Sequence, residues 1–188
     1  QPTAPVIVSI ETDGQSQVNL GVLVFETDNW DQPQQVSIWA VDDSVAEGLH
    51  DSTITHDISS LDRRYDNLQP TDLTALIEDN DVAGIAVSPT SLTVAEPDGT
   101  AVFTAALSSM PVEPVSLPLV TSTDDCAVQP ASLTVDSGNW QAGARATVLA
   151  VDNSVVDGER TCTVLTGPAE SGDPAYDGWD PEDVVVTV

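Results

Sequence analysis

The chain has 188 residues, 40% of them hydrophobic, and its 31 acidic residues against four arginines and no lysine give a formal charge of -27. This charge excludes nucleic acids and anionic membrane surfaces as partners, because binding to either needs Lys and Arg to displace counterions. No run approaches the roughly 18 apolar residues that span a bilayer, so we expect no membrane insertion. No basic and then apolar leader opens the chain, and we expect it to be mature or excised from something longer.

The chain repeats itself after about one domain's length, since VDDSVAEG at residues 41–48 returns as VDNSVVDG at 151–158. A spacing of 110 relates Asn29-Trp30 to Asn139-Trp140, Ala40-Val41-Asp42 to Ala150-Val151-Asp152, and Gly48 to Gly158. A spacing of 111 relates Tyr65-Asp66 to Tyr176-Asp177, and Asp72 to Asp183. A slip of one residue is what a loop insertion between paired strands produces. We therefore interpret the chain as a tandem duplication.

The first unit, residues 1–82, opens on Pro5-Val6-Ile7-Val8, which aligns near Val115-Ser116-Leu117-Pro118 of the second. It continues with QQVSIWAV at 34–41 and closes with DLTALI at 72–77, followed by the acidic tail EDND at 78–81. Short runs rich in Val, Ile, Thr and Leu, bounded by Asp, Asn, Gly and Pro, are typical of β-strands.

The second unit, residues 83–188, is nearly complete. Two strands are expected around the AEPDGT turn at 95–100, followed by VSLPLV, ASLTV, ARATVLAV, ERTCTVLTG and DVVVTV. Thirteen prolines and eleven glycines leave room for short helices at most. The pattern predicts an all-β fold of two tandem immunoglobulin-like antiparallel β-sandwiches.

The first unit has no counterpart to the opening pair of strands in the second. It corresponds to the last five strands of a seven-strand domain, so we expect it to lack its first two strands and to expose a sheet edge and part of its apolar core. Either the chain has been cut from a longer one, or another chain or segment supplies these strands.

The segment NWDQPQQVSIWAVDDSVAEG, continuing through STITHDISSLDRRYDNL to a closing strand and EDND, resembles the Calx-β family of sandwich modules. The resemblance is to the form found in tandem arrays in large extracellular bacterial proteins. SLTVAEPDGTAVFTAALS also resembles the first two strands of that family, so the resemblance covers essentially the whole chain. It implies an extracellular or cell-surface location.

Better-known Calx-β modules bind calcium at one end of the sandwich, and flexible acidic loops supply the six to eight oxygens that calcium takes. In the first unit the resemblance implies the ligands Asp42, Asp43, the carbonyl of Val45, Glu47, Asp79, Asp81 and Asp13. In the second unit it implies Glu96, Asp124 or Asp125, Asp152, Asn153 and Asp157. Each set is incomplete, because the first unit lacks the first-loop acid and the second lacks the tail. Asp, Asn and Gly also form turns and caps, so loops without an ion are the alternative.

Cys126 and Cys162 lack the C-x-x-C spacing of a zinc or redox site, and they either pair or stay buried. Trp30 and Trp140 follow the same Asn, so we expect a repeated structural plug, with a sugar-binding face as the alternative. No G-x-S-x-G occurs and neither histidine has an evident nucleophile partner. We therefore expect no enzymatic activity.

The sequence predicts a structural spacer or rod of an extracellular adhesin, matrix protein or surface filament, with calcium stiffening the acidic domain ends. The expected partners are neighbouring repeats or identical subunits. The alternative is a module that recognises a glycan or another surface through Trp-bearing loops. In a further variant, the incomplete first unit accepts strands from a neighbouring subunit and so joins protomers into a filament.

Overall fold

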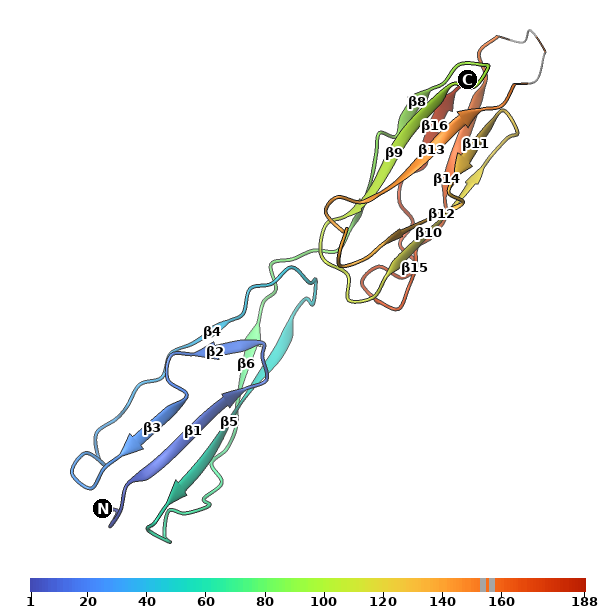
Figure 1. The fold of residues 1–188 in the computed structure, drawn as a ribbon. Helices are drawn as coiled ribbons and strands as arrows, with labels where there is room; N and C mark the ends of the chain where they lie inside the picture. The colour runs from blue at the N-terminus through green and yellow to red at the C-terminus, as the bar shows by residue number, and fades with distance from the viewer. Residues whose placement is uncertain (153–154, 156–157) are drawn as a thin grey trace. The chain divides into compact units, whose positions relative to one another are not determined.

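The fold is given by a computed structural model that describes residues 1–152, 155 and 158–188. The described residues form β-strands and no helix, which confirms the all-β prediction. The chain divides into two compact units (Figure 1): unit 1 comprises Gln1–Asp43 and Gly48–Asp79, and unit 2 comprises Ser44–Glu47 and Asn80–Val188. The main division thus falls between residues 79 and 80, three residues before the expected one.

Unit 1 has one four-stranded antiparallel sheet and one pair of short strands. Its strands are β1 (Val6–Thr12), β2 (Ser16–Val18), β3 (Val22–Phe25), β4 (Ile38–Ala40), β5 (His50–Ser60) and β6 (Leu73–Ile77). The sheet has the order β3-β1-β5-β6, and β2 pairs with β4. Val6 lies opposite both Phe25 and Ser60, which sets the register of β3, β1 and β5.

Unit 2 is a two-sheet sandwich. Its strands are β7 (Ile85–Ser88), β8 (Ser91–Thr93), β9 (Thr100–Leu107), β10 (Val115–Thr121), β11 (Cys126–Gln129), β12 (Ser132–Val135), β13 (Ala144–Ala150), β14 (Thr161–Thr166), β15 (Glu170–Ser171) and β16 (Val184–Thr187). One sheet has the order β12-β10-β14-β16-β8, with β15 also pairing with β10, and the other has the order β11-β13-β9-β7. The pairing of β8 with β16 is parallel.

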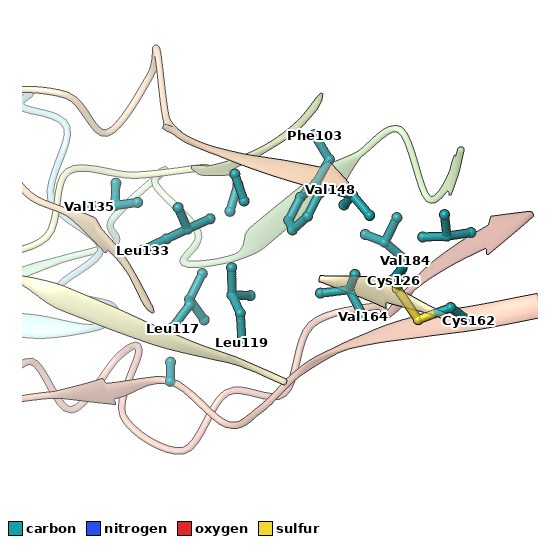
Figure 2. Close-up of a cluster of buried hydrophobic side chains, with 14 of the residues drawn as sticks. Phe103, Leu117, Leu119, Cys126, Leu133, Val135, Val148, Cys162, Val164 and Val184 are labelled. Carbon is teal, nitrogen blue, oxygen red and sulfur yellow. A yellow bond between two sulfur atoms is a disulfide. The ribbon is translucent and has the colours of Figure 1, made fainter. Parts of the chain in front are cut away.

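The core of unit 2 lies between these two sheets. Figure 2 shows Phe103 and Val148 of one sheet facing Leu117 and Leu119 of the other, and all four side chains are buried. Alternate residues of β9, β10 and β13 are buried, as expected for strands with one face on a core. Cys126 and Cys162 form a disulfide that joins β11 of one sheet to β14 of the other, which decides between the two alternatives for the cysteines.

The duplication is visible in matching hydrogen bonds. The N–H of Val41 donates to Gln15 as that of Val151 does to Asp125, and the N–H of Glu26 donates to the Asn29 side chain as that of Asp136 does to Asn139. The offset is 109 at the first strand, because the hydroxyl of Ser60 donates to the carbonyl of Pro5 as that of Ser171 does to Pro114. The repeat therefore contains one slip more than the sequence motifs indicate.

Among the described residues, unit 1 has no counterpart of β7, β8 or β9, which confirms that it lacks the opening strands. The first of the two expected strands is divided around Pro89, which has no N–H to donate to a ladder, and its halves β7 and β8 pair in different sheets. Three further short strands, β2, β11 and β15, were not expected from the sequence. The run at 34–41 pairs over Ile38–Ala40 alone.

Candidate functional site

Asp13, an expected calcium ligand, accepts three hydrogen bonds within unit 1. Its Oδ2 accepts the N–H of Thr53 at 2.6 Å, and its Oδ1 accepts the hydroxyl of Ser52 at 2.8 Å and the N–H of Gln15 at 3.1 Å. These bonds, that from Thr53 foremost, lower the pKa of the Asp13 carboxyl below its ordinary value. The carboxylate is therefore the acceptor that caps an amide of β5.

The same place in unit 2 shows that this role needs no carboxylate. There the N–H of Thr163 donates to the hydroxyl of Ser122 at 2.9 Å, and the N–H of Ser122 donates to the carbonyl of Thr163, as that of Asp13 does to Thr53. Since serine and aspartate are both strand caps here, the position of Asp13 is explained by structure alone.

Asp79, from the acidic tail, holds the glycine that ends the VDDSVAEG loop. Gly48 has a φ of +66°, in the left-handed region that favours glycine, and its N–H donates to Oδ2 of Asp79 at 2.9 Å. The tail therefore meets the loop inside unit 1, and the contact is a carboxylate bound to a backbone amide.

The remaining expected ligands near this loop are distributed between the units. Asp42 and Asp43 follow β4 in unit 1 and have exposed side chains. Glu47 is exposed, and Val45 and Asp81 are half-buried; these three residues belong to unit 2.

In unit 2, Glu96 is exposed in the turn between β8 and β9, where the N–H of Gly99 donates to the carbonyl of Ala95. Glu96 lines a hollow of about 410 Å³ together with Gly158 and Arg160, so the loop after β13 does lie beside the turn.

Three other expected ligands of unit 2 lie in loops. Asp124 and Asp152 are exposed, and Asp125 accepts a hydrogen bond from the hydroxyl of Thr123 at 2.9 Å. Asn153 and Asp157 lie outside the described residues.

Within residues 1–152, 155 and 158–188, no group of three or more Asp, Glu, His or Cys side chains is placed to hold a metal ion. Calcium takes six to eight oxygens at 2.3–2.6 Å, whereas Asp13 and Asp79 already accept backbone amides. Calcium binding by these acids stays a prediction of the sequence.

Two aspartates that the sequence analysis missed are buried at the same turn of each unit. Asp62 accepts the N–H groups of Thr3 and Arg64, and Asp173 accepts those of Val112 and Ala175. Asp62 ties the segment before β1 to the turn before β6, and Asp173 ties the segment before β10, the counterpart of β1, to the turn before β16. The repeated D-x-x-Y-D of residues 62–66 and 173–177 is the signal that could have found them.

The Asp62 carboxylate has a further partner in unit 1. The Arg64 guanidinium donates to it from Nη2 at 2.6 Å and from Nε at 3.0 Å. Arg64 is the main cause that holds the pKa of the Asp62 carboxyl far below its ordinary value. The basic pair at residues 63–64 thus has a structural role, through its second member.

The disulfide of unit 2 has a polar counterpart in unit 1. Ser16 and Ser52 lie 110 residues before Cys126 and Cys162, both are buried, and their hydroxyls are 2.7 Å apart. The hydroxyl of Ser52 continues to the Asp13 carboxylate. A hydrogen-bonded chain thus occupies the place of a covalent bridge.

The tryptophans differ between the units. Trp140 is half-buried and packs against the core of unit 2, as a structural plug would, whereas its counterpart Trp30 is 43% exposed. Trp39 and Trp179 are also exposed, at 48% and 42%.

No protein-family model matches the chain, and no curated protein matches it. Three solved structures are similar in part. WR4, an MSP family member of C. elegans, is 16% identical with a TM-score of 0.34, covering 55% of this chain and 94% of its own. The D0-D1 domain of intimin is 13% identical with a TM-score of 0.31, over 98% of this chain and 83% of its own. The D00-D0 domain of intimin is 11% identical with a TM-score of 0.32, over 95% of this chain and 98% of its own. Because these scores are low, the fold described above rests on the strand pairing itself.

Proposed function

We propose that the chain is a non-catalytic structural spacer from an extracellular or cell-surface protein, built from tandem β-sandwich repeats. One observation carries the proposal: buried Asp62 and Asp173 make the same backbone hydrogen bonds in both units. The two units share a hydrogen-bonded framework that holds strands together, which is what a module that carries tension or sets a spacing needs.

The location outside the cell is supported by the disulfide between Cys126 and Cys162, since disulfides persist in oxidising compartments. A net charge of -27 keeps the chain away from nucleic acids and anionic membrane surfaces. Among the described residues, no helix is long and apolar enough to cross a membrane. The partners of a spacer are neighbouring repeats or identical subunits.

Stretching single molecules of the chain tests the spacer role. We expect separate unfolding events for the two units. Because 36 residues separate the two cysteines, reduction should lengthen the unit 2 event by about 120 Å. If the chain extended like an unstructured polypeptide, without separate unfolding events, a spacer that carries load would be contradicted.

The Calx-β relationship, with calcium stiffening the acidic loops, is the finer part of this proposal and is supported by the motif order in the sequence. A calorimetric calcium titration tests it, with the double substitution Asp42→Asn and Asp43→Asn expected to abolish binding. Asp28→Asn, an exposed acid on another loop, is the matched control and should leave binding unchanged. If millimolar calcium released no heat and did not shift the melting temperature, calcium binding would be contradicted, whereas the proposed spacer role would be unaffected.

A recognition module is the second candidate, favoured by the exposure of Trp39 and Trp179. Aromatic side chains with an exposed face can stack on sugar rings. Binding to a glycan array, lost in Trp39→Ala or Trp179→Ala, would support it, whereas an array without binding would contradict it.

A further inference from the structure

Unit 1 has an open apolar groove at the place where unit 2 has its core. The groove, of about 240 Å³, is lined by Pro2, Val6, Val8, Phe25, Trp30, Ile58 and Tyr65. By the offsets of 109 to 111, the counterparts in unit 2 are Pro111, Val115, Leu117, Val135, Trp140, Ala169 and Tyr176. Six of the seven are buried, and Trp140 packs against them. In unit 2 the same cluster contains Phe103, Ala105 and Leu107 of β9, for which unit 1 has no counterpart.

A second hollow of unit 1, of about 290 Å³, lies between β4 and β6 and is lined by residues including Ile38, Ala75 and Ile77. Ile38 is 39% exposed, whereas its counterpart Val148 is fully buried. Leu73 is 51% exposed, whereas its counterpart Val184 is fully buried. Ile38 and Leu73, whose counterparts are buried in unit 2, are therefore exposed in unit 1.

Two strands of unit 1, β4 and β6, are edge strands at the same places. In unit 2, β13 pairs with β9 and β16 pairs with β8. Their counterparts β4 and β6 pair with β2 and β5, and no strand in the described part of unit 1 pairs with their other sides. Both edges can therefore accept main-chain hydrogen bonds from an added strand, while the groove accepts its alternate side chains.

We propose that unit 1 is a strand-acceptor site for an extended segment with the pattern of residues 84–109, supplied by polypeptide outside residues 1–188. The segment would place one strand beside β4, with apolar side chains at the positions of Phe103, Ala105 and Leu107 in the groove. A second, shorter strand would lie parallel to β6, as β8 lies beside β16. The inference is independent of the spacer role.

Charge argues against a second copy as the occupant. Two chains of charge -27 repel each other, and the β7 to β9 segment of a second copy already fills the core of its own unit 2. A segment of the required pattern is nearly neutral, since residues 84–109 contain two acids, Glu96 and Asp98, and no basic residue.

The test adds a synthetic peptide of residues 84–109 to the whole chain, and measures peptide binding by calorimetry and protection of the chain by amide hydrogen exchange. We expect saturable binding of one peptide per chain, with at least tenfold slower exchange at β4 and β6. A peptide with Phe103→Asp should bind at least tenfold more weakly, because Phe103 occupies the core in unit 2.

Two matched variants of the chain locate the site. Ile38→Asp, on β4 in the second hollow, should weaken peptide binding at least tenfold, whereas Val22→Asp, at a 53% exposed position on β3, should not change the affinity. Absence of peptide binding, or equal binding of the Phe103→Asp peptide, would overturn the proposal. Dimerisation of the chain alone that Ile38→Asp abolishes would place a second copy at the β4 edge and also overturn it.

Discussion

At the scale of single residues, the acids of this chain act first on their own backbone. Asp13, Asp62 and Asp79 each accept backbone N–H groups, and in unit 2 a serine replaces the first of them. A carboxylate that caps an amide and one that binds calcium have the same neighbours in sequence, since both lie in loops with Gly and Asn. Sequence could therefore place the acidic loops but could not determine their chemistry.

Removing Asp173 should destabilise unit 2. Asp173→Ala leaves the N–H groups of Val112 and Ala175 without this acceptor, at a side chain that is 4% exposed. We expect a loss of about 2–3 kcal/mol in the free energy of unfolding, measured by denaturant titration. Asp180→Ala, at an exposed position, should change it by less than about 0.5 kcal/mol.

Unit 1 should lose stability in acid. The pKa values of Asp13 and Asp62 are lowered in the folded state from an ordinary 3.8, so the unfolded chain binds more protons. The stabilisation is therefore present above about pH 4 and is lost as the pH falls through the lower folded values. Denaturant titrations from pH 6 to pH 2, with hydrogen exchange to follow unit 1, measure this.

In that series Asp62→Asn should be less stable than the wild type at pH 6 and should depend less on pH below 4. Asp28→Asn, an exposed acid, is the control and should keep the pH dependence of the wild type. If Asp62→Asn lost as much stability as the wild type between pH 4 and pH 2, the ion pair of Asp62 with Arg64 would contribute nothing to the pH dependence.

At the scale of elements, the repeated motifs predicted the strands that fill the core. ASLTV contains β12 and ARATVLAV contains β13. Alternating β-branched and polar residues fit a strand with one face on the core and the other on the solvent, so these runs could be recognised from the sequence. The short strands β2 and β11 have three and four residues, too few for alternation to be recognised. Their importance lies in Ser16 and Cys126, whose partners on β5 and β14 are 36 residues away, a relation that local pattern does not contain.

A second disulfide should form in unit 1 when its serine pair is replaced. Ser16→Cys with Ser52→Cys places two thiols where unit 2 has its bridge, and the hydroxyls they replace are 2.7 Å apart. Closing a loop of this length should stabilise unit 1 by about 3–4 kcal/mol in the chain-entropy account.

Thiol titration and melting with and without reductant measure that bridge. The single substitution Ser52→Cys is the control, since it removes the bond to Asp13 without making a bridge. Two free thiols in the oxidised double variant would show that the strands of unit 1 are not held as those of unit 2 are.

At the scale of the whole molecule, the two units share a framework but not a core. Of the described hydrophobic residues, four are buried in unit 1 (Val6, Ile10, Ile54 and Ile77) and nineteen in unit 2. Each fully buried aliphatic side chain contributes about 1.5–3 kcal/mol, so unit 1 lacks much of what stabilises unit 2. The sequence could predict this imbalance, because the missing strands were visible as an absent segment of the repeat.

We therefore expect two unfolding transitions in denaturant. Unit 1 should unfold first, and reductant should lower the second transition, because the Cys126–Cys162 bridge lies in unit 2. Loss of a bridge spanning 36 residues corresponds to about 3–4 kcal/mol. Hydrogen exchange assigns each transition to its unit, and a Cys126→Ser/Cys162→Ser chain should show the lowered transition without reductant. If reductant shifted the first transition instead, stability would not follow the covalent bridge and the filled core, and the open groove of unit 1 would have to be stabilised by contacts other than buried side chains.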